Sequence, residues 1–528
     1  MKKAVQKGLF LGVVFLIAIY IINIFLLNIF ALDNNINSEI AFEIIFAKQI
    51  QREHTLFPIR FFYGYELSAL RPAFLATLLD GFLHSAMLSY AWALNITLIL
   101  LLISLVYFLK GLNLQWFEIV VSVLAWLAIP AYMFNAYVQY LYNGYFGFYT
   151  IVIFLILGIY VRLDGFLYKK ICIYLVLLGI PSFIFGLMGA RMLQMIYLPL
   201  ALYEFICLFI NIWQKKKVAF RLRQVIFSVC LLVSNLLGFA LFTLFFSDKF
   251  IFNMIPSEVV FRPVEQLHES TTVTLAELLC AMGAYFGAPI ISLKGMLYLA
   301  TMAMAIIIIV ATVLIIKYHY TAETPCIACL SILITFTICS LTWWKVMSRY
   351  FMMYSVLLAI VTALIIKYLI EKEQTFFINF LVICLMIVAI GNVGATYGAM
   401  LQIKNEPPSL QGVIGYLEDK GIPNCYGMSV GLEIGSLTNF EIDSAYVFYD
   451  EEKNEITFGS MSSYDSFDAS KAKEKSALLV TNSDYEKYGE KWEEIEYFKD
   501  VVEVEQLWDY RVYVFDYNPF IDKNHMFD

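Results

Sequence analysis

Long apolar runs, separated by short polar connections, fill residues 1–398 of the chain. Each run is about 18 residues or longer and is bounded by charged residues, which is the pattern of transmembrane helices. The first run is too long for the core of a signal peptide and lacks a clean small-residue cleavage site, so we expect it to remain as an anchor. We expect eleven spans, near residues 8–32, 84–109, 115–136, 146–163, 170–188, 192–212, 224–246, 296–316, 325–343, 350–367 and 376–397.

The composition agrees with this pattern. Hydrophobic residues make up 61% of the chain and charged residues only 15%, and the mean hydropathy is +0.74, which excludes a soluble protein of this length. The nine cysteines are scattered, and most lie inside apolar runs. Cys326 and Cys329 form a CxxC motif inside an expected span. We interpret them as packing residues rather than a redox or zinc pair, because no second pair of ligands lies nearby in the sequence.

Basic residues predict the orientation of the spans. They cluster before span one and after spans two, four, six, eight and ten, which the positive-inside rule assigns to the cytoplasm. They are Lys2, Lys3, Lys7, Lys110, Arg162, Lys169, Lys170, Lys215, Lys216, Lys217, Arg221, Arg223, Lys317, Lys367 and Lys372. We therefore expect a multi-pass plasma-membrane protein with a cytoplasmic N-terminus. Two long loops, residues 33–83 and 247–294, would then lie outside; the first would carry amphipathic helices and the second a helical middle.

The chain changes character after residue 398. Residues 399–528 carry 26 acidic and 11 basic side chains, and short β-rich runs alternate there with helical pieces such as "SLQGVIGYLEDKG". This predicts a small extracytoplasmic α/β domain that follows a transmembrane domain of residues 1–398. Its acidity argues against a nucleic-acid partner. A purely solubilising and capping role for this domain is the alternative.

The spans carry few charged residues. Glu204 is the clear exception, and we assign it a structural hydrogen-bonding role. A coupled transporter would carry more intramembrane charge. Polar chemistry gathers instead in the outer loops, which suits an enzyme whose lipid-linked substrate has its phosphate at headgroup level. The uncharged aromatic segment 135–149 is either an interfacial belt or a platform on which sugars stack.

Four short segments carry a resemblance to a known family. They are "DNNINSEIAFEIIFAKQI", "FFYGYELSAL", "GARMLQMIYLPL" and "CYGMSVGLEIGSLTNFEI". Together with the order of spans, loops and terminal domain, they resemble the GT-C superfamily of polyprenyl-phosphate-sugar-dependent membrane glycosyltransferases, in a clostridial-type subfamily. The resemblance implies a GT-C-like fold and the inverting transfer of a sugar from a polyprenyl-phosphate donor to an extracytoplasmic glycan, lipid or protein acceptor.

The subfamily's first motif has the form D-x-D-x-x-S-E. Asp33 occupies its first position and Glu39 its Glu, whereas Asn35 replaces the second Asp. A neutral amide is a poorer ligand for a divalent cation than a carboxylate, so a complete metal-binding D-x-D pair is not supported. The cofactor is therefore left open. Asn35 is retained as a substrate-binding candidate.

The second motif has the form W-Y-Y-x-x-E-L. Tyr63 and Glu66 match it, while Phe61 and Phe62 replace the Trp and the first Tyr. The resemblance implies substrate-binding roles for Tyr63 and Glu66, and Arg60 is the basic candidate beside them. Ordinary solvated positions are the alternative for the acidic residues of the loop.

The chemistry assigns roles to the loop carboxylates. Inverting transfer needs a carboxylate to take the proton of the acceptor hydroxyl, and Asp33, at the membrane boundary, is the first choice for this base. Glu39 would orient the acceptor or exchange roles with Asp33. In the alternative interpretation, Asp33 only stops the span and caps the next helix.

Cations at the outer ends of spans are the candidate ligands for the donor phosphate. We name Arg191, Arg349 and Lys345, and Arg60 and Arg71 in the first loop are further candidates. Snorkelling to the interface is the alternative for each. At the level of function, the alternatives to transfer are a flippase or transporter of lipid-linked glycans and an inactive scaffold. Transport predicts a hydrated path at mid-membrane, whereas catalysis predicts a cavity at the outer headgroup level.

Overall fold

The computed structural model describes most of the chain. The described residues are 2–33, 36–64, 66–128, 146–214, 221–252, 260–283, 289, 291–318, 323–342, 346–405, 409–428, 430–459, 462–492 and 494–521. They form two compact units, each of which is discontinuous in sequence. The helical unit comprises Met1–Leu26, Asn95–Phe245 and Ser257–Ala399, and the mixed unit comprises Leu27–Leu94, Phe246–Pro256 and Met400–Asp528.

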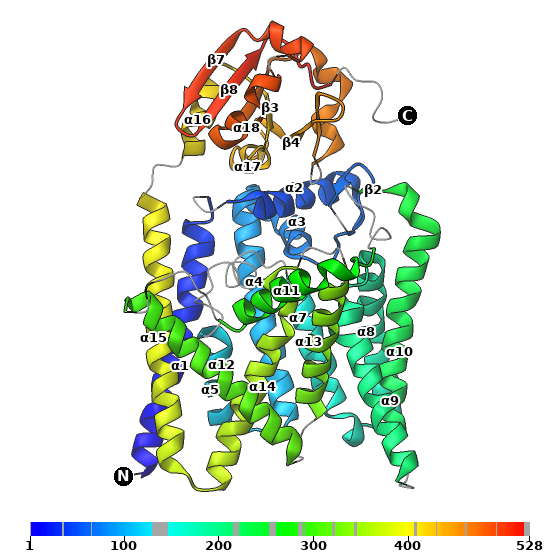
Figure 1. Cartoon of the computed structure of the whole chain (residues 1–528), viewed down its shortest axis with the longest axis vertical. Helices are drawn as coiled ribbons and strands as arrows, with labels where there is room; N and C mark the ends of the chain where they lie inside the picture. The colour runs from blue at the N-terminus through cyan, green and yellow to red at the C-terminus, as the bar shows by residue number, and fades with distance from the viewer. Residues whose placement is uncertain are drawn as a thin grey trace. The chain divides into compact units, whose positions relative to one another are not determined.

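Nine helical segments within the described ranges are long and apolar enough to cross a membrane, so the chain is a polytopic membrane protein. They are α1 (Lys2–Phe30), α4 (Ala86–Gly111), α8 (Tyr168–Met188), η5 (Leu193–Tyr197) with α9 (Leu198–Trp213), α10 (Leu222–Leu241), α12 (Leu293–Lys317), α13 (Glu323–Leu341), α14 (Met353–Glu371) and α15 (Thr375–Asn405) (Figure 1). The two other expected spans correspond to shorter helices, α5 (Trp116–Ala128) and α7 (Gly147–Tyr160). Residues 129–145, with most of the aromatic segment, lie outside the described residues.

Helices α8 and α10 lie side by side and pack with their backbones in contact. A Cβ atom added at Gly186 of α8 would meet the carbonyl oxygen of Asn235 at 2.1 Å, and one added at Gly238 of α10 would meet that of Phe183 at 2.1 Å. The Asn235 amide also donates a hydrogen bond of 2.9 Å to the carbonyl of Ser182. Small residues allow this approach, which favours association between helices in lipid.

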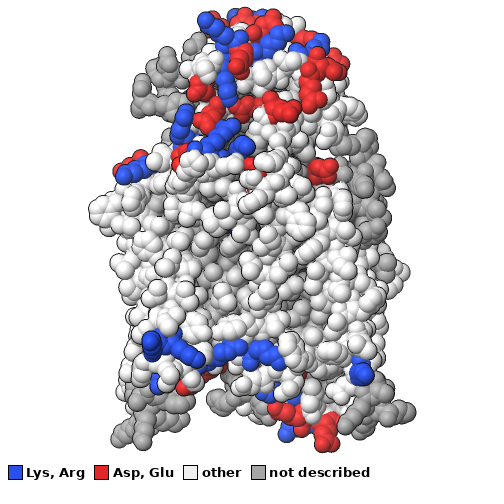
Figure 2. Space-filling model, turned by 180° about the vertical axis from the view of Figure 1, so that it is seen from behind, with Lys and Arg blue, Asp and Glu red and all other residues white. Residues whose placement is uncertain are grey.

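Glu204 is buried and belongs to a polar cluster of the helical unit. It accepts hydrogen bonds from the hydroxyl of Tyr160 and, at 3.2 Å, from Arg221, which also pairs with Glu323 at 2.6 Å. These contacts confirm the structural hydrogen-bonding role that the sequence predicts. The surface of the helical unit is largely apolar. On the face in Figure 2, a broad band shows no charged side chain, and Lys and Arg gather along one edge of the band.

The loop of residues 247–294 has the helical middle that the sequence predicts. Helix α11 (Leu267–Ala281) follows a short turn, η10 (Val264–Gln266), and packs on α13 in the helical unit. The hydroxyl of Ser270 donates a hydrogen bond of 2.9 Å to the carbonyl of Ser340, and the two segments also join through a bridge between Phe261 and Thr342.

A six-stranded sheet forms the centre of the mixed unit, and all of its strands lie in the C-terminal part of the chain, where the sequence predicts strands. Its order is β5 (Glu455–Phe458), β4 (Asp443–Asp450), β3 (Asn424–Gly427), β6 (Ser476–Thr481), β8 (Tyr510–Phe515), β7 (Glu503–Leu507). The three central strands are parallel, and β5, β8 and β7 pair in antiparallel fashion with their neighbours.

Alternation along the central strands builds two cores. In β6, Ala477 and Leu479 face one core, whereas Leu478 and Val480 face the other, because successive side chains point to opposite faces of a sheet. Helices α16 (Ser409–Asp419) and α17 (Leu432–Leu437) cover the first face, and α18 (Asn482–Trp492) covers the second.

The first loop belongs to the same compact unit. It contains two helices, α2 (Ser38–Glu53) and α3 (Pro72–Leu83), where the sequence predicts helices without fixing their number, and α2 packs on both α3 and α17. Between them, β1 (Phe62–Tyr63) pairs in parallel with β2 (Ile251–Phe252), which follows α10 and two short turns.

Candidate functional site

The two candidate carboxylates flank the start of α2. Asp33 is exposed and lies three residues after the end of α1. Helix α2 begins where Asn37 accepts a hydrogen bond of 3.0 Å from the amide of Ile40, and Glu39 lies in the first turn, where the helix dipole favours a carboxylate. Glu39 is half-buried. Asn35 lies outside the described residues.

One turn after Glu39, the carboxylate of Glu43 enters a buried ion cluster. Arg71 donates to Glu43 at 3.0 Å and to Glu66 at 3.1 Å, and the three side chains are 2%, 1% and 9% exposed, in the order Arg71, Glu43, Glu66. The second oxygen of Glu43 accepts from the amide of Ala73 at 3.3 Å, in the first turn of α3. The cluster therefore fastens α2 to α3.

Burial dominates the electrostatics of this cluster. It raises the pKa of Glu43 above its ordinary value, and the Arg71 guanidinium opposes that rise. Two carboxylates share this one guanidinium. Removing one partner of such a buried set leaves an uncompensated charge, which is strongly destabilising. Glu39 is thus carried by a helix that is firmly anchored one turn further on.

The other predicted residues of the first loop have structural partners. Tyr63 is fully buried; its hydroxyl donates to the carbonyl of Pro58 at 2.9 Å, and its ring contacts Phe46 and Phe61 in an aromatic core. Burial raises the pKa of Tyr63, so its hydroxyl stays protonated. Glu66 belongs to the ion cluster. Arg60 is 55% exposed and pairs with Asp465 at 3.3 Å.

Residues 462–471 of the terminal domain hold the first loop; we call them the 462–471 segment. Its backbone accepts from the amide of Phe62 at 2.9 Å, and the Tyr464 amide donates to the Arg60 carbonyl at 3.1 Å. Asp465 also pairs with Arg52, the basic residue in the last turn of α2, at 3.0 Å. A buried hydrogen bond of 2.9 Å joins Ser463 to Gln49 on the same helix.

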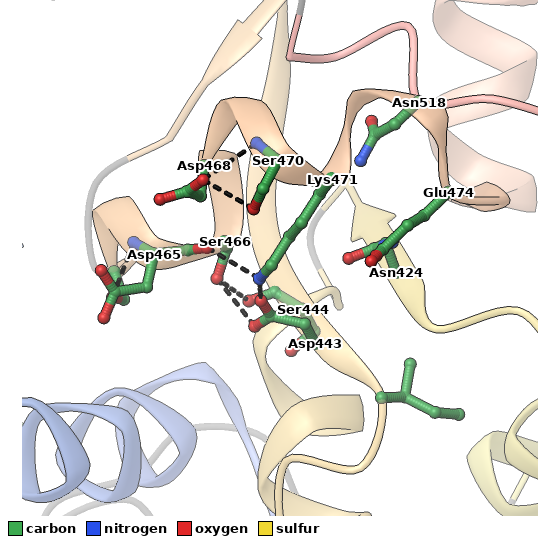
Figure 3. Close-up of polar contacts among 12 residues, drawn as sticks. Asn424, Asp443, Ser444, Asp465, Ser466, Asp468, Ser470, Lys471, Glu474 and Asn518 are labelled. Carbon is green, nitrogen blue, oxygen red and sulfur yellow. Dashed lines mark hydrogen bonds and ion pairs between the residues drawn. The ribbon is translucent and has the colours of Figure 1, made fainter.

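A polar network ties this segment to the sheet (Figure 3). Lys471 forms an ion pair with Asp443, the first residue of β4, and donates to the carbonyl of Asp465 at 2.7 Å. The hydroxyl of Ser466 donates to the same Asp443 carboxylate at 2.9 Å. Burial lowers the pKa of Lys471, and Arg52 adds to the effect. The network holds Asp465 where it meets the two arginines of the first loop.

In the helical unit, two of the predicted phosphate ligands meet at one aromatic ring. The guanidinium of Arg191 lies 5.2 Å from the centre of the Phe146 ring, and that of Arg349 lies 6.0 Å from it. Arg191 also lies 5.3 Å from the ring of Tyr350. Arg191 follows the end of α8 at Gly189, where φ is +130°, and Arg349 lies in η11 (Ser348–Phe351).

Both arginines are half-buried, and their guanidinium groups come from separate segments of the helical unit to the same aromatic ring. The third predicted ligand, Lys345, lies outside the described residues. Phe146 itself falls in the aromatic segment that the sequence singles out, although its position between two arginines was not predicted. Asp465 and Ser463 were missed, because a polar turn such as "MSSYDSFDAS" reads as an ordinary solvated loop.

Within the ranges that the structure describes, no group of three His, Cys, Asp or Glu side chains is placed to hold a metal ion. Comparison with known proteins adds no relative: no family model matches the chain, and neither a curated protein nor a solved structure matches it.

Proposed function

We propose that the chain is a GT-C-like membrane glycosyltransferase that uses a polyprenyl-phosphate sugar. In this proposal, the half-buried pair Arg191 and Arg349 binds the donor phosphate. Asp33 acts as the general base and Glu39 orients the acceptor. The acceptor is an extracytoplasmic glycan, lipid or protein, and the donor is drawn from the bilayer.

The reaction is an inverting displacement at the anomeric carbon. The carboxylate of Asp33 takes the proton of the acceptor hydroxyl, and the oxygen attacks the anomeric carbon from the face opposite the phosphate. The bond between that carbon and the phosphate oxygen breaks, and polyprenyl phosphate leaves with the electron pair. The guanidinium groups stabilise the negative charge that develops on the leaving phosphate.

The observation that carries the proposal is the convergence of Arg191 and Arg349 on Phe146. The two arginines come from separate segments of the helical unit, and each was a candidate from sequence alone. Arginine is the side chain best suited to phosphate, because its planar fork presents several donors at once. Two such forks at one ring suit a phosphate monoester or diester better than a neutral solute.

The test is a transfer assay with purified protein and a panel of polyprenyl-phosphate sugars, in which release of polyprenyl phosphate is measured. We expect Asp33→Asn to lower the rate by roughly 10²–10⁴ while donor binding persists. Arg191→Ala and Arg349→Ala should weaken donor binding instead. Glu39→Gln should give a smaller loss, or one that depends on the acceptor.

The matched controls are Glu265→Gln and Arg223→Ala. Glu265 is an exposed acid of η10, and the Arg223 guanidinium donates to the backbone carbonyl of Asp164. Both controls should turn over like the wild type. Wild-type rates in Asp33→Asn and Glu39→Gln together would show that the carboxylates are only ordinary loop and helix residues. Wild-type donor affinity in both arginine variants would remove the phosphate site from the proposal.

A further inference from the structure

A long apolar groove runs along α12 and α14 in the helical unit. Its volume is about 670 Å³, and it is lined by residues from Ile306 to Tyr318 on one side and from Leu364 to Lys372 on the other. The thirteen residues from Ile306 to Tyr318 span about 18 Å of helix, more than half of a hydrocarbon core of about 30 Å. The volume lies in the range of small-molecule sites.

One end of the groove is polar and basic. Tyr318 and Tyr368 line it there, and each ring has a lysine ammonium near it: Lys317 at 5.6 Å from the Tyr318 ring and Lys372 at 5.9 Å from the Tyr368 ring. Tyrosine favours the membrane interface, because its ring is apolar and its hydroxyl is polar. This end therefore has the chemistry of the headgroup level, and the rest of the groove that of acyl chains.

Glu371, which precedes Lys372 in sequence, lies on a different face of α14. Lys367 and Glu371 are one turn apart on α14, and both interact electrostatically with Glu118 of α5. Tyr368 and Lys372, also one turn apart, line the groove with α12. The groove end itself is lined by Tyr318, Tyr368 and Lys372, with Lys317 beside the Tyr318 ring.

We propose that this groove binds an anionic phospholipid from the leaflet on the Lys317 and Lys372 side. Its acyl chain lies along α12 and α14, and its phosphate pairs with the two lysines. The positive-inside rule assigns this leaflet to the cytoplasm, where anionic lipids attract clusters of basic residues. The proposed site is independent of the glycosyl-transfer site.

A second apolar cavity extends the groove. It has a volume of about 320 Å³, shares Ile307 and Ile365 with the groove, and continues toward Val121 and Val388. A long acyl chain is thus accommodated beyond the groove itself.

The test uses the full-length protein in nanodiscs that contain phosphatidylglycerol and phosphatidylcholine with the same acyl chains. Native mass spectrometry, after release into the gas phase, counts the lipids that remain bound. We expect at least five-fold preference for phosphatidylglycerol in the wild type. The double variant Lys317→Gln/Lys372→Gln should lose this preference, and Ala311→Trp, which fills the groove, should lose the bound lipid altogether.

The matched control is Lys367→Gln, on the other face of α14, which should retain the wild-type preference. Monodisperse elution and an unchanged melting temperature establish that each variant is folded. Equal binding of both lipids, or a preference that survives in the double variant, would overturn the headgroup assignment. Retention of lipid by Ala311→Trp would overturn the groove as a lipid site. A wild-type protein that dimerises and carries no bound lipid would overturn it as well.

Discussion

Arg71 and Glu43 form an ion pair of 3.0 Å, in which the two side chains are 2% and 1% exposed. Glu43 follows Glu39 by one helical turn on α2, and Arg71 is the N-terminal cap residue of α3. The pair links the helix that carries a proposed catalytic carboxylate to the next helix of the loop. Its energetic weight comes from burial, since each charge would be costly without the other.

Arg71→Ala should therefore destabilise the protein by about 3–5 kcal/mol, because two buried carboxylates lose their cation. The measurement is thermal unfolding of the full chain in detergent. Lys48→Ala is the control, since Lys48 pairs with Asp80 at 3.8 Å and its side chain is 31% exposed. Loss of a pair with that exposure should cost about 1 kcal/mol or less. Equal losses in both variants would contradict this account of the cluster.

Glu433 should make stability fall as pH rises. Its side chain is 3% exposed in α17, and burial raises its pKa to about 7 from an ordinary 4.5. The folded state thus holds this proton more tightly than the unfolded chain, so stability is lost as pH rises from about 4.5 through 7. A shift of this size corresponds to about 3 kcal/mol.

Glu433→Gln should remove that loss. We expect the variant to melt above the wild type at pH 8, with the difference much reduced at pH 5. The control is Glu441→Gln, an exposed acid close by in the same unit, whose melting temperature should follow the wild type at both pH values. A constant difference between Glu433→Gln and the wild type across this range would exclude the titration of Glu433.

Asp465→Asn should loosen the 462–471 segment from the first loop. The carboxylate pairs with both Arg52 and Arg60, and each pair is partly exposed, so we expect a total loss of about 1–2 kcal/mol. This corresponds to roughly 5- to 30-fold faster hydrogen exchange at the amides of Phe62 and Tyr464, if exchange proceeds by local opening. Asp450→Asn, which affects a pair with Lys453 in the same domain, should leave these amides unchanged.

Gly186→Ala should disturb the packing of α8 on α10, because the new Cβ would lie 2.1 Å from a backbone carbonyl oxygen that cannot rotate away. The helices must separate, so we expect a loss of about 1–3 kcal/mol, seen as a lower melting temperature. Gly179→Ala on the same helix is the control. Its Cβ would approach only the Ser234 hydroxyl, at 3.8 Å, and should be tolerated.

The first loop illustrates what sequence patterns could and could not predict. The apolar residues from Ile40 to Phe46 predict a helix, and α2 forms there, because periodicity acts over a few residues. Its cap is Asn37, not Asp33 as the alternative interpretation had it. The partners of Arg71, by contrast, could not be predicted from sequence. From sequence it is a candidate phosphate ligand, whereas in the fold its guanidinium lies on Glu43 and Glu66. No local signal distinguishes these two outcomes.

The sequence by itself determined the membrane-spanning helices and the alternating strands of the terminal domain. Both follow from burial along a short stretch of chain: a bilayer demands long apolar helices, and a sheet with two cores demands apolar residues on both faces. Only the tertiary structure decided that Arg52 meets Asp465 across 413 residues, and that Arg191 and Arg349 share the ring of Phe146. Such contacts depend on how whole elements pack, and the polar residues that make them look locally like any solvated position.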